Sequence, residues 1–370
     1  MSSWGKILKE VQESAAARAP QGLGPDLDGI RLEYIERIRE LGNNERAVIV
    51  YASGWLRGDK PDVEASVGPA DVHALMEVCH EVEERKLDLI LHSPGGSGQA
   101  AEQMLNYLRT QFDEIRAFVP LQAKSAATMI ALGCDQIVMG KHSELGPIDP
   151  QLLIPVPEGQ RFAPAHAIVR DFRRAQQEIA QNVQMLPAWT PILRTYAGGL
   201  IEYCIQQIQL SQEVVAGWLE KHMLAHDDAG VSEDERAQRA KQIAEYFGSE
   251  AAYDRFRTHG RPIRIEELQA VEGLRIKPME EDDDLQDAVL SLYHALDITF
   301  GGPAIKIVEN HLAARYVRLT QTFAVQVPLQ PGQPGGPQQP VPQAPGIPQP
   351  ALPDRAEQRR RERAAKKGRP

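Results

Sequence analysis

Short apolar runs alternate with segments of helical spacing between residues 45 and 156. Most of the apolar runs contain β-branched residues and end at polar or glycine positions, a pattern typical of buried strands. The predicted strands are RAVIVYAS (46–53), LDLILHS (87–93), EIRAFVP (114–120) and QIVMG (136–140), and the predicted helices lie at 70–86, 97–112 and 125–133. Alternation of this kind indicates βα units around a mainly parallel sheet. We therefore expect an α/β fold in this part of the chain.

The segments on either side of this region show helical periodicity. Residues 1–44 form a predicted helical leader, whose apolar positions near one face are Ile30, Leu32, Tyr34, Ile35, Ile38 and Leu41. A helical insert at about 165–250 is expected to cap the sheet edge, and its amphipathic pair of helices is expected to pack on the core or on a neighbouring subunit. Its apolar positions are Ile201, Ile205, Ile208, Val215 and Leu219. We assign residues 45–280 to a core domain that contains this insert, and residues 281–327 to C-terminal helices.

The last segment differs in composition from the rest. Between residues 328 and 353 prolines recur about every third residue with Gln and Gly between them, which favours extended polyproline II and cannot build a core. The end, DRAEQRRRERAAKKGRP, carries eight Lys or Arg residues and three acids. We expect residues 328–370 to be a disordered tail whose basic end can dock on an acidic partner, RNA or an anionic membrane surface.

Composition narrows the class of protein. A chain with 42% hydrophobic and 25% charged residues is expected to be soluble and globular, and its net charge of -10 argues against a nucleic-acid-binding protein as a whole. No apolar run approaches the roughly 20 residues that span a bilayer, and the first residues lack the apolar middle of a secretion signal. We expect a cytoplasmic protein without a transmembrane segment. Cys79, Cys134 and Cys204 are widely spaced, which predicts core residues rather than disulfides or a zinc site.

A diglycine and a serine are predicted to meet at one edge of the sheet. Gly95 and Gly96 follow the strand at 87–93, and Ser125 opens a helix after the strand at 114–120. Ligands bind at the carboxyl edge of open parallel sheets. The amides of the glycine pair and of Ala126 can form an oxyanion hole, and the helix N-terminus favours developing negative charge near Ser125. The alternative is that Ser125 only caps the helix.

Candidate bases return to the same edge. The helix at 125–133 descends about 12 Å and the strand at 136–140 climbs about 16 Å, which brings Lys141 and His142 back to the level of Ser125. A nucleophile, an oxyanion hole and a base can then share one site. The acidic run at 280–284 lacks the alternating ligands of a calcium loop and is expected to be a solvated helix start. We expect neither a metal nor a cofactor.

Three motifs follow one another in the middle of the chain: HSPGGSGQAAEQM (92–104), AKSAATMIALGCDQIVMG (123–140) and HSELGPIDPQL (142–152). In this order and spacing they resemble the serine dehydrogenase proteinase family, and GRPIRIEELQAVEGL (260–274) extends a weaker similarity to about residue 280. The family is related to signal peptide peptidase A and to the proteolytic subunit of Clp protease. The resemblance implies a Clp/crotonase-like ββα superhelix, hydrolysis of peptide bonds by an activated serine, and a ring-type homo-oligomer.

The resemblance also implies roles for individual residues. Ser125 occupies the position of the nucleophile, and Gly95, Gly96 and Ala126 match the oxyanion-hole donors. The Clp branch uses a histidine as general base and the signal peptide peptidase branch uses a lysine. His142, Lys124 and Lys141 are the candidates in the matching stretch, and a residue from the helical region or from another subunit stays open.

The candidate bases differ in their chemistry. His142 can act near neutral pH without a shift of its pKa. Lys124 needs a pKa lowered by desolvation, and its side chain diverges from that of the adjacent Ser125 by about 100°. Asp149 either fixes its proline-flanked loop or orients a base. His259, just before the GRPIRIEEL segment, is either a surface turn residue or part of the site.

Two functions of other classes stay open. A crotonase-type acyl-CoA hydratase, isomerase or hydrolase uses the same paired-amide hole without a serine nucleophile. A catalytically inactive scaffold would recruit partners through its Pro-rich tail. For the peptidase, the expected substrate is a short peptide or an unfolded protein. The chain has no Walker motif, so any energy-dependent unfolding requires an ATPase or adaptor partner.

Overall fold

The computed structural model describes residues 4–58, 62–156, 159–226 and 231–320. These residues belong to one compact unit, Met1–Thr322. The predicted tail at 328–370 lies outside the described residues. None of the described helices combines the length and the apolar character that are needed to cross a bilayer.

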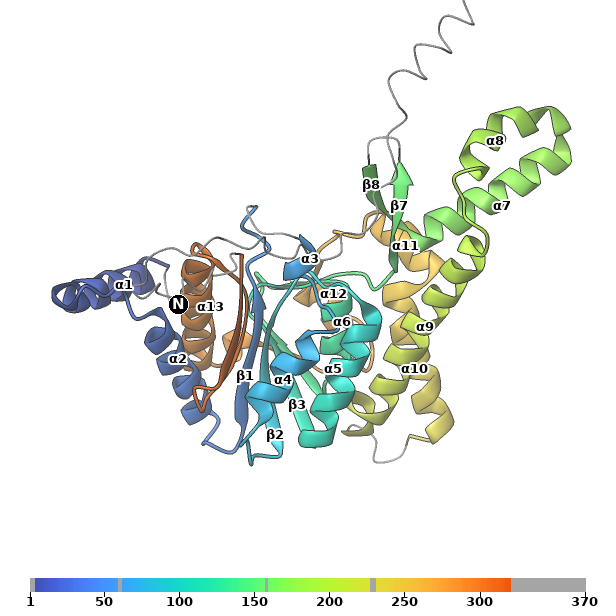
Figure 1. The fold of residues 1–370 in the computed structure, drawn as a ribbon. Helices are drawn as coiled ribbons and strands as arrows, with labels where there is room; N and C mark the ends of the chain where they lie inside the picture. The colour runs from blue at the N-terminus through green and yellow to red at the C-terminus, as the bar shows by residue number, and fades with distance from the viewer. Residues whose placement is uncertain (1–3, 59–61, 157–158, 227–230, 321–370) are drawn as a thin grey trace, which may run out of the picture. The chain divides into compact units, whose positions relative to one another are not determined.

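A seven-stranded sheet in the order β10-β5-β3-β2-β1-β11-β12 forms the centre of the fold (Figure 1). Its parallel strands are β1 (Ala47–Ser53), β2 (Lys86–His92), β3 (Glu114–Val119), β5 (Gln136–Met139) and β10 (Ile276–Pro278). The remaining strands, β11 (Ala304–Asn310) and β12 (Arg315–Leu319), continue the sheet in antiparallel pairing from β1. All four strands predicted from the sequence are confirmed, as is the parallel α/β arrangement.

Alternate residues of the strands pack into two different cores, because successive side chains of a strand point to opposite faces. On one face, Ile49 and Leu89 pack with α4 (Asp71–Cys79), α5 (Gly98–Gln111) and α6 (Ala126–Leu132). On the other face, Val48 and Ile90 pack with α2 (Leu27–Leu41) and α13 (Asp283–Phe300). The leader region consists of α1 (Trp4–Arg18) and α2, so the predicted helical character of residues 1–44 is found as two helices.

A second, three-stranded sheet joins distant parts of the chain beside the main sheet. It consists of β4 (Gln122–Ala123), β6 (Glu144–Leu145) and β9 (Ile263–Arg264), with β4 parallel and β9 antiparallel to β6. The residues after β4, the residues after β6 and the residues before β9 therefore meet at one end of this sheet. The short helix α3 (Asp62–Ala65) lies in the connection between β1 and β2, and the short helix α12 (Ile265–Gln269) directly follows β9.

The predicted helical insert begins after a hairpin of β7 (Gln151–Val156) and β8 (Gly159–Pro164). Its helices are α7 (Ala165–Gln181), α8 (Leu186–Leu193), α9 (Leu200–Lys221), α10 (Glu233–Gly248) and α11 (Glu250–Phe256). The apolar face predicted for α9 is confirmed, because Val215 and Leu219 are buried in the main core, and Ile201, Ile205 and Ile208 pack on a smaller core with α7. Figure 1 shows α9 running from the core into the part of the insert that holds α7 and α8.

The prediction of C-terminal helices over 281–327 is wrong for its second half. Asp283–Phe300 is helical, but Ala304–Asn310 and Arg315–Leu319 form strands. All seven residues of β11 are buried, since this strand lies between β1 and β12 and packs on both faces. The predicted helix at 70–86 is shorter than expected and ends at Cys79, before the polar segment 80–86. The acidic run is a helix start, as predicted: the side chain of Asp282 caps α13 by accepting the N–H of Leu285.

Candidate active site

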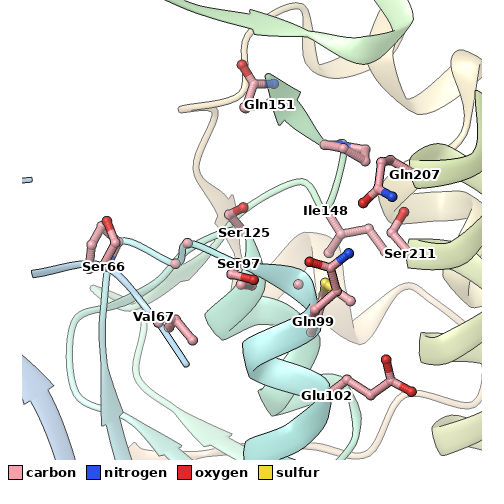
Figure 2. A pocket seen from close by; sticks show the side chains of 18 of the residues that line it. Ser66, Val67, Ser97, Gln99, Glu102, Ser125, Ile148, Gln151, Gln207 and Ser211 are labelled. Atoms are coloured by element: carbon pink, nitrogen blue, oxygen red, sulfur yellow. The ribbon is translucent and has the colours of Figure 1, made fainter. Parts of the chain in front are cut away.

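A cavity of about 720 Å³ is lined by residues that follow β1, β2 and β4, together with residues of the insert. Ser125, Gly95, Gly96 and Ala126 all contribute to its wall. Figure 2 shows Ser125 and Ser97 near each other, with Gln207 and Ser211 of α9 on the facing side. The structure therefore brings the predicted nucleophile and the predicted diglycine into one cavity.

Ser125 has an unusual backbone conformation at the start of α6. Its φ is 52° and its ψ is -118°, and its side chain makes no capping hydrogen bond although it occupies the N-cap position. A non-glycine residue with positive φ carries strain of about 1–3 kcal/mol, and such strain is found mainly where function requires a fixed geometry. The hydroxyl group is thus not used to cap the helix, so the alternative that Ser125 is only an N-cap is wrong.

The diglycine lies directly against the backbone of the serine. A Cβ atom on Gly95 would lie 2.3 Å from the carbonyl oxygen of Lys124 and 2.6 Å from Cβ of Ser125. The φ angles of Gly95 and Gly96 are 89° and 148°. Only glycine fits here, because side chains rarely adopt these φ angles and the space for a Cβ is already filled. The close approach that the sequence predicts is therefore present.

Two backbone amides at this contact have no protein acceptor among the described residues. They are the N–H groups of Gly96 and Ala126. The N–H of Gly95 instead donates to Oγ of Ser93 over 3.2 Å. Of the three predicted oxyanion-hole donors, the amides of Gly96 and Ala126 are thus available to a substrate oxygen, whereas the amide of Gly95 stabilises its own loop. A pair of such amides at a helix N-terminus can stabilise a developing negative charge.

His259 reaches the same cavity from a distant part of the sequence. Its Nδ1 lies 2.8 Å from Oδ1 of Asp149, and its side chain is one quarter exposed, at 26%. Oδ2 of Asp149 accepts a second hydrogen bond from Nε2 of Gln151 over 2.8 Å. Because a carboxylate only accepts hydrogen bonds, Nδ1 of His259 carries a proton, and in the neutral imidazole Nε2 is then the acceptor. His259 lines the cavity together with Ser125.

The three-stranded sheet explains why these residues meet. Ala123 pairs with Leu145, and Leu145 pairs with Ile263. Ser125 comes two residues after Ala123, Asp149 comes four residues after Leu145, and His259 comes four residues before Ile263. Since β9 is antiparallel to β6, the residues after β4, after β6 and before β9 lie at the same end of the sheet. Ser125, Asp149 and His259 therefore lie beyond the same end.

Two other predicted bases, Lys124 and His142, form polar contacts with residues that do not line the cavity. The Lys124 amine is buried, lies 2.8 Å from Oε1 of Glu144 and donates to the carbonyl oxygen of Leu145 over 3.2 Å. Burial lowers the pKa of Lys124, and the hydrogen bond and charge of Glu144 oppose this shift. Nε2 of His142 lies 3.0 Å from the carbonyl oxygen of Pro120. Lys124 and His142 are not among the described residues that line the cavity.

Lys141 is exposed, and its backbone N–H donates to the side chain of Glu280 over 2.8 Å. It too is absent from the described lining of the cavity. The roles of Lys141, Lys124 and His142 as bases stay predictions.

Metal and thiol chemistry find no support in the described residues. They contain no group of three or more His, Cys, Asp or Glu side chains that could hold a metal ion. Cys79, Cys134 and Cys204 are buried and unpaired, which confirms their predicted place in the core. Burial raises the pKa of the Cys79 and Cys134 thiols to about 12, so these groups are protonated at neutral pH.

Comparison with known proteins confirms the family resemblance for the central part of the chain. Residues 71–188 match the family model of ClpP-like SDH-type serine proteinases. This range contains Gly95, Ser125 and Asp149 and ends before His259.

Two uncharacterized proteins of Methanocaldococcus jannaschii are similar to parts of this chain. MJ0137 is 45% identical over 69 residues, which are 19% of this chain and 24% of that protein. MJ1495 is 33% identical over 104 residues, which are 28% of this chain and 33% of that protein. The chain thus spans between about a quarter and a third of the length of these curated relatives. Among solved structures, the 1510-N membrane-bound stomatin-specific protease is similar with a TM-score of 0.33 and 14% identity, over 57% of this chain and 74% of that one.

Proposed function

We propose that this chain is a serine peptidase in which Ser125 is the nucleophile, His259 is the general base and Asp149 orients the base. The observation that carries this proposal is one cavity that holds both the strained, uncapped Ser125 and a histidine whose Nδ1 is held by a buried carboxylate. The match of residues 71–188 to a serine proteinase family supports the same assignment. We also propose the Clp/crotonase-like ββα superhelix for the core.

Acylation uses the three residues in sequence. Nε2 of His259 takes the proton from the Ser125 hydroxyl while Oγ attacks the carbonyl carbon of the scissile peptide bond. The electron pair of the C=O bond moves to oxygen, and the N–H groups of Gly96 and Ala126 donate to this oxyanion. When the tetrahedral intermediate collapses, the C–N bond breaks and the leaving amine takes the proton from His259. The products are an acyl-enzyme and a free amine.

Deacylation repeats the steps with water. His259 accepts a proton from a water molecule, whose oxygen attacks the ester carbon, and the same amides hold the oxyanion. The ester bond breaks, Ser125 Oγ regains the proton from His259, and the carboxylic acid leaves. No oxidant, metal or cofactor is needed, because each step moves one proton and one electron pair between groups that the chain, the peptide and water supply.

The positions of the other candidate bases give them less support than His259. Lys124 would have to leave Glu144, and His142 would have to leave the carbonyl of Pro120, to face the cavity. Either residue would then replace His259 in the proposed reaction. Replacing each residue separately and measuring peptide hydrolysis decides between them.

We propose a peptide or unfolded protein segment as the substrate, with a basic side chain close to the scissile bond. Among the described residues that line the cavity, Glu102 is the one carboxylate, and no lysine or arginine joins it. Glu102 makes no ion pair with any described residue and lies on α5 one turn beyond Gly98 (Figure 2). Met129 and Val214 supply apolar surface for the methylene groups of a lysine or arginine.

We further propose that the protein acts as a ring-type homo-oligomer, as the resemblance implies. Three large apolar side chains near α8, Val183, Leu186 and Ile192, are 71%, 46% and 43% exposed, which is in keeping with a contact between subunits. Light scattering of the purified chain tests this. An ATPase or adaptor partner, a role of the tail and a cytoplasmic location stay predictions.

Hydrolysis of a fluorogenic peptide library by wild type and Ser125→Ala tests the proposed function. Ser211→Ala is the matched control, because Ser211 lines the same cavity but its hydroxyl donates to the carbonyl of Ile208. We expect wild type and Ser211→Ala to cleave peptides and Ser125→Ala to be inactive. Equal hydrolysis by wild type and Ser125→Ala would refute the proposal.

A further inference from the structure

A fully buried ion pair lies behind the wall of the cavity. Lys306 of β11 and Asp71 at the start of α4 are 0% exposed, and the Lys306 amine lies 2.8 and 2.7 Å from the two carboxylate oxygens. The hydroxyl of Tyr51 donates to Oδ2 of Asp71 over 2.7 Å. A buried ion pair is weak evidence for stability by itself, because desolvation offsets the attraction. The role of this pair therefore lies in the other hydrogen bonds that Lys306 and Asp71 make.

The ion pair holds both ends of the segment 66–68. The Lys306 amine donates to the carbonyl oxygen of Ser66 over 2.7 Å, and the N–H of Gly68 donates to Oδ2 of Asp71 over 2.8 Å. This segment lines the cavity next to the diglycine. The backbone N–H and C=O groups of the middle residue, Val67, point toward residues 95–97.

Val67 in turn fixes the peptide between Gly95 and Gly96. Its N–H donates to the carbonyl oxygen of Gly95 over 2.7 Å, and its carbonyl oxygen accepts the N–H of Ser97 over 2.9 Å. In a planar trans peptide the C=O and the following N–H point in opposite directions. The N–H of Gly96 therefore points away from Val67, and it is one of the two amides without a protein acceptor among the described residues.

We infer that Lys306 and Asp71 are positioning residues for the oxyanion hole. They hold the segment 66–68, which keeps the Gly95–Gly96 peptide in the orientation that presents the Gly96 N–H to the substrate carbonyl. This inference rests on the proposed function. Without the ion pair, the Gly95 carbonyl loses its fixed donor, the peptide can rotate, and the hole loses one of its two amides.

Lys306→Met tests this inference, with Arg31→Met as the matched control. Arg31 is also fully buried and is paired with Glu309 on the same strand, 2.7 Å from Oε1, but this pair makes no contact with the segment 66–68 among the described residues. Hydrogen exchange is measured first, because it does not depend on activity. We expect Lys306→Met to increase deuterium uptake at residues 64–70 and 93–100, and we expect Arg31→Met to leave both segments protected.

Kinetics provide the second measurement. We expect Lys306→Met to lower kcat about 100-fold with KM nearly unchanged, because one oxyanion donor contributes about 10²–10³ in kcat. Inhibition by a peptide aldehyde, whose adduct places an oxygen in the hole, should weaken by a similar factor. Arg31→Met should retain kcat within about twofold after correction for the folded fraction. Equal losses in both variants would overturn the inference.

Tyr51→Phe provides a milder variant in case Lys306→Met does not fold. It removes only the hydroxyl that donates to Asp71 and keeps the ring in the core. We expect a several-fold loss of kcat and increased exchange at 64–70. Unchanged exchange and unchanged kcat in a folded Tyr51→Phe would overturn the inference. If the wild type shows no hydrolysis that depends on Ser125, the proposed function fails, whereas the exchange data still decide whether Lys306 holds this segment.

Discussion

Nδ1 of His259 lies 2.8 Å from Oδ1 of Asp149, across 110 positions of sequence. Asp149 is buried, and its other oxygen accepts a hydrogen bond from Gln151. The carboxylate is thus held from both sides, and in the neutral imidazole that donates from Nδ1, Nε2 is the remaining acceptor. Replacement of the histidine therefore tests whether this pair supplies the base.

His259→Gln should lower kcat/KM for peptide hydrolysis by about 10²–10⁴-fold, because a positioned general base contributes about that factor. His142→Gln is the control, since Nε2 of His142 contacts the carbonyl of Pro120 and this residue is absent from the described lining of the cavity. It should retain activity within about threefold. Steady-state kinetics of both variants decide the base. A large loss in His142→Gln with an active His259→Gln would assign the base to His142.

Gly95→Ala should abolish activity and destabilise the fold by about 1–3 kcal/mol, because a Cβ here overlaps the carbonyl of Lys124 and Cβ of Ser125. Gly98→Ala is the matched control. Gly98 lies in α5, and a Cβ added to it would have Sδ of Met129 as its nearest neighbour at 3.6 Å, an ordinary contact. Urea unfolding and peptide hydrolysis measure both effects. A stable and active Gly95→Ala would show that the glycine is not required for the approach of the loop to Ser125.

Glu102→Gln should reduce kcat/KM for substrates with Lys or Arg next to the scissile bond by about 10- to 150-fold, since the loss of one charge-assisted hydrogen bond costs about 1.5–3 kcal/mol. Substrates with Leu or Met there should be unchanged. Glu77→Gln removes an equal charge from an exposed position of α4 and should change neither class. Paired peptide substrates measure the ratio. If wild type does not prefer basic peptides, Glu102 does not set specificity.

His92 should make the fold sensitive to acid. Burial lowers the pKa of His92 to about 4, against the hydrogen bond to Gln122 and the charge of Asp297, which raise it. The ring packs against Trp55 and Tyr293. Between pH 6.5 and 4 the unfolded chain binds the proton that the folded chain excludes, so stability falls as the pH falls through this window, by about 3 kcal/mol in total.

The free energy of urea unfolding at a series of pH values measures this dependence. His92→Gln should give a shallower slope between pH 6.5 and 4 than wild type does. His222, whose pKa burial also lowers to about 4, should leave part of the slope in place. A slope unchanged by His92→Gln would show that His92 is not the source.

The strands and the site of the nucleophile could be predicted from local patterns. The strands at 46–53, 87–93, 114–120 and 136–140 each pack on two cores, so apolar residues occupy both faces. In the sequence each of them is therefore a short, nearly continuous apolar run. The approach of Gly95 to Ser125 could be predicted from parallel strand topology, because Gly95 lies in the connection after β2 and Ser125 in the connection after β3, at the carboxyl edge of the sheet.

The base and the last strands depend on pairings that no local pattern contains. His259 reaches the cavity because β9 pairs with β6, two strands of two residues each. Such short strands give no periodicity, so a turn histidine looks like a surface residue in the sequence. Likewise β11 is stabilised by antiparallel pairing with β1, about 250 residues earlier, and its seven residues lack the alternation of a half-exposed strand.

The site of modification by a fluorophosphonate probe tests the central claim most directly. Wild-type protein is treated with the probe and digested, and the modified peptide is identified by mass spectrometry. We predict a single adduct on Oγ of Ser125, absent in Ser125→Ala and formed much more slowly in His259→Gln. Modification of another residue, or no modification of correctly folded wild-type protein, would contradict the assignment of Ser125 as an activated nucleophile.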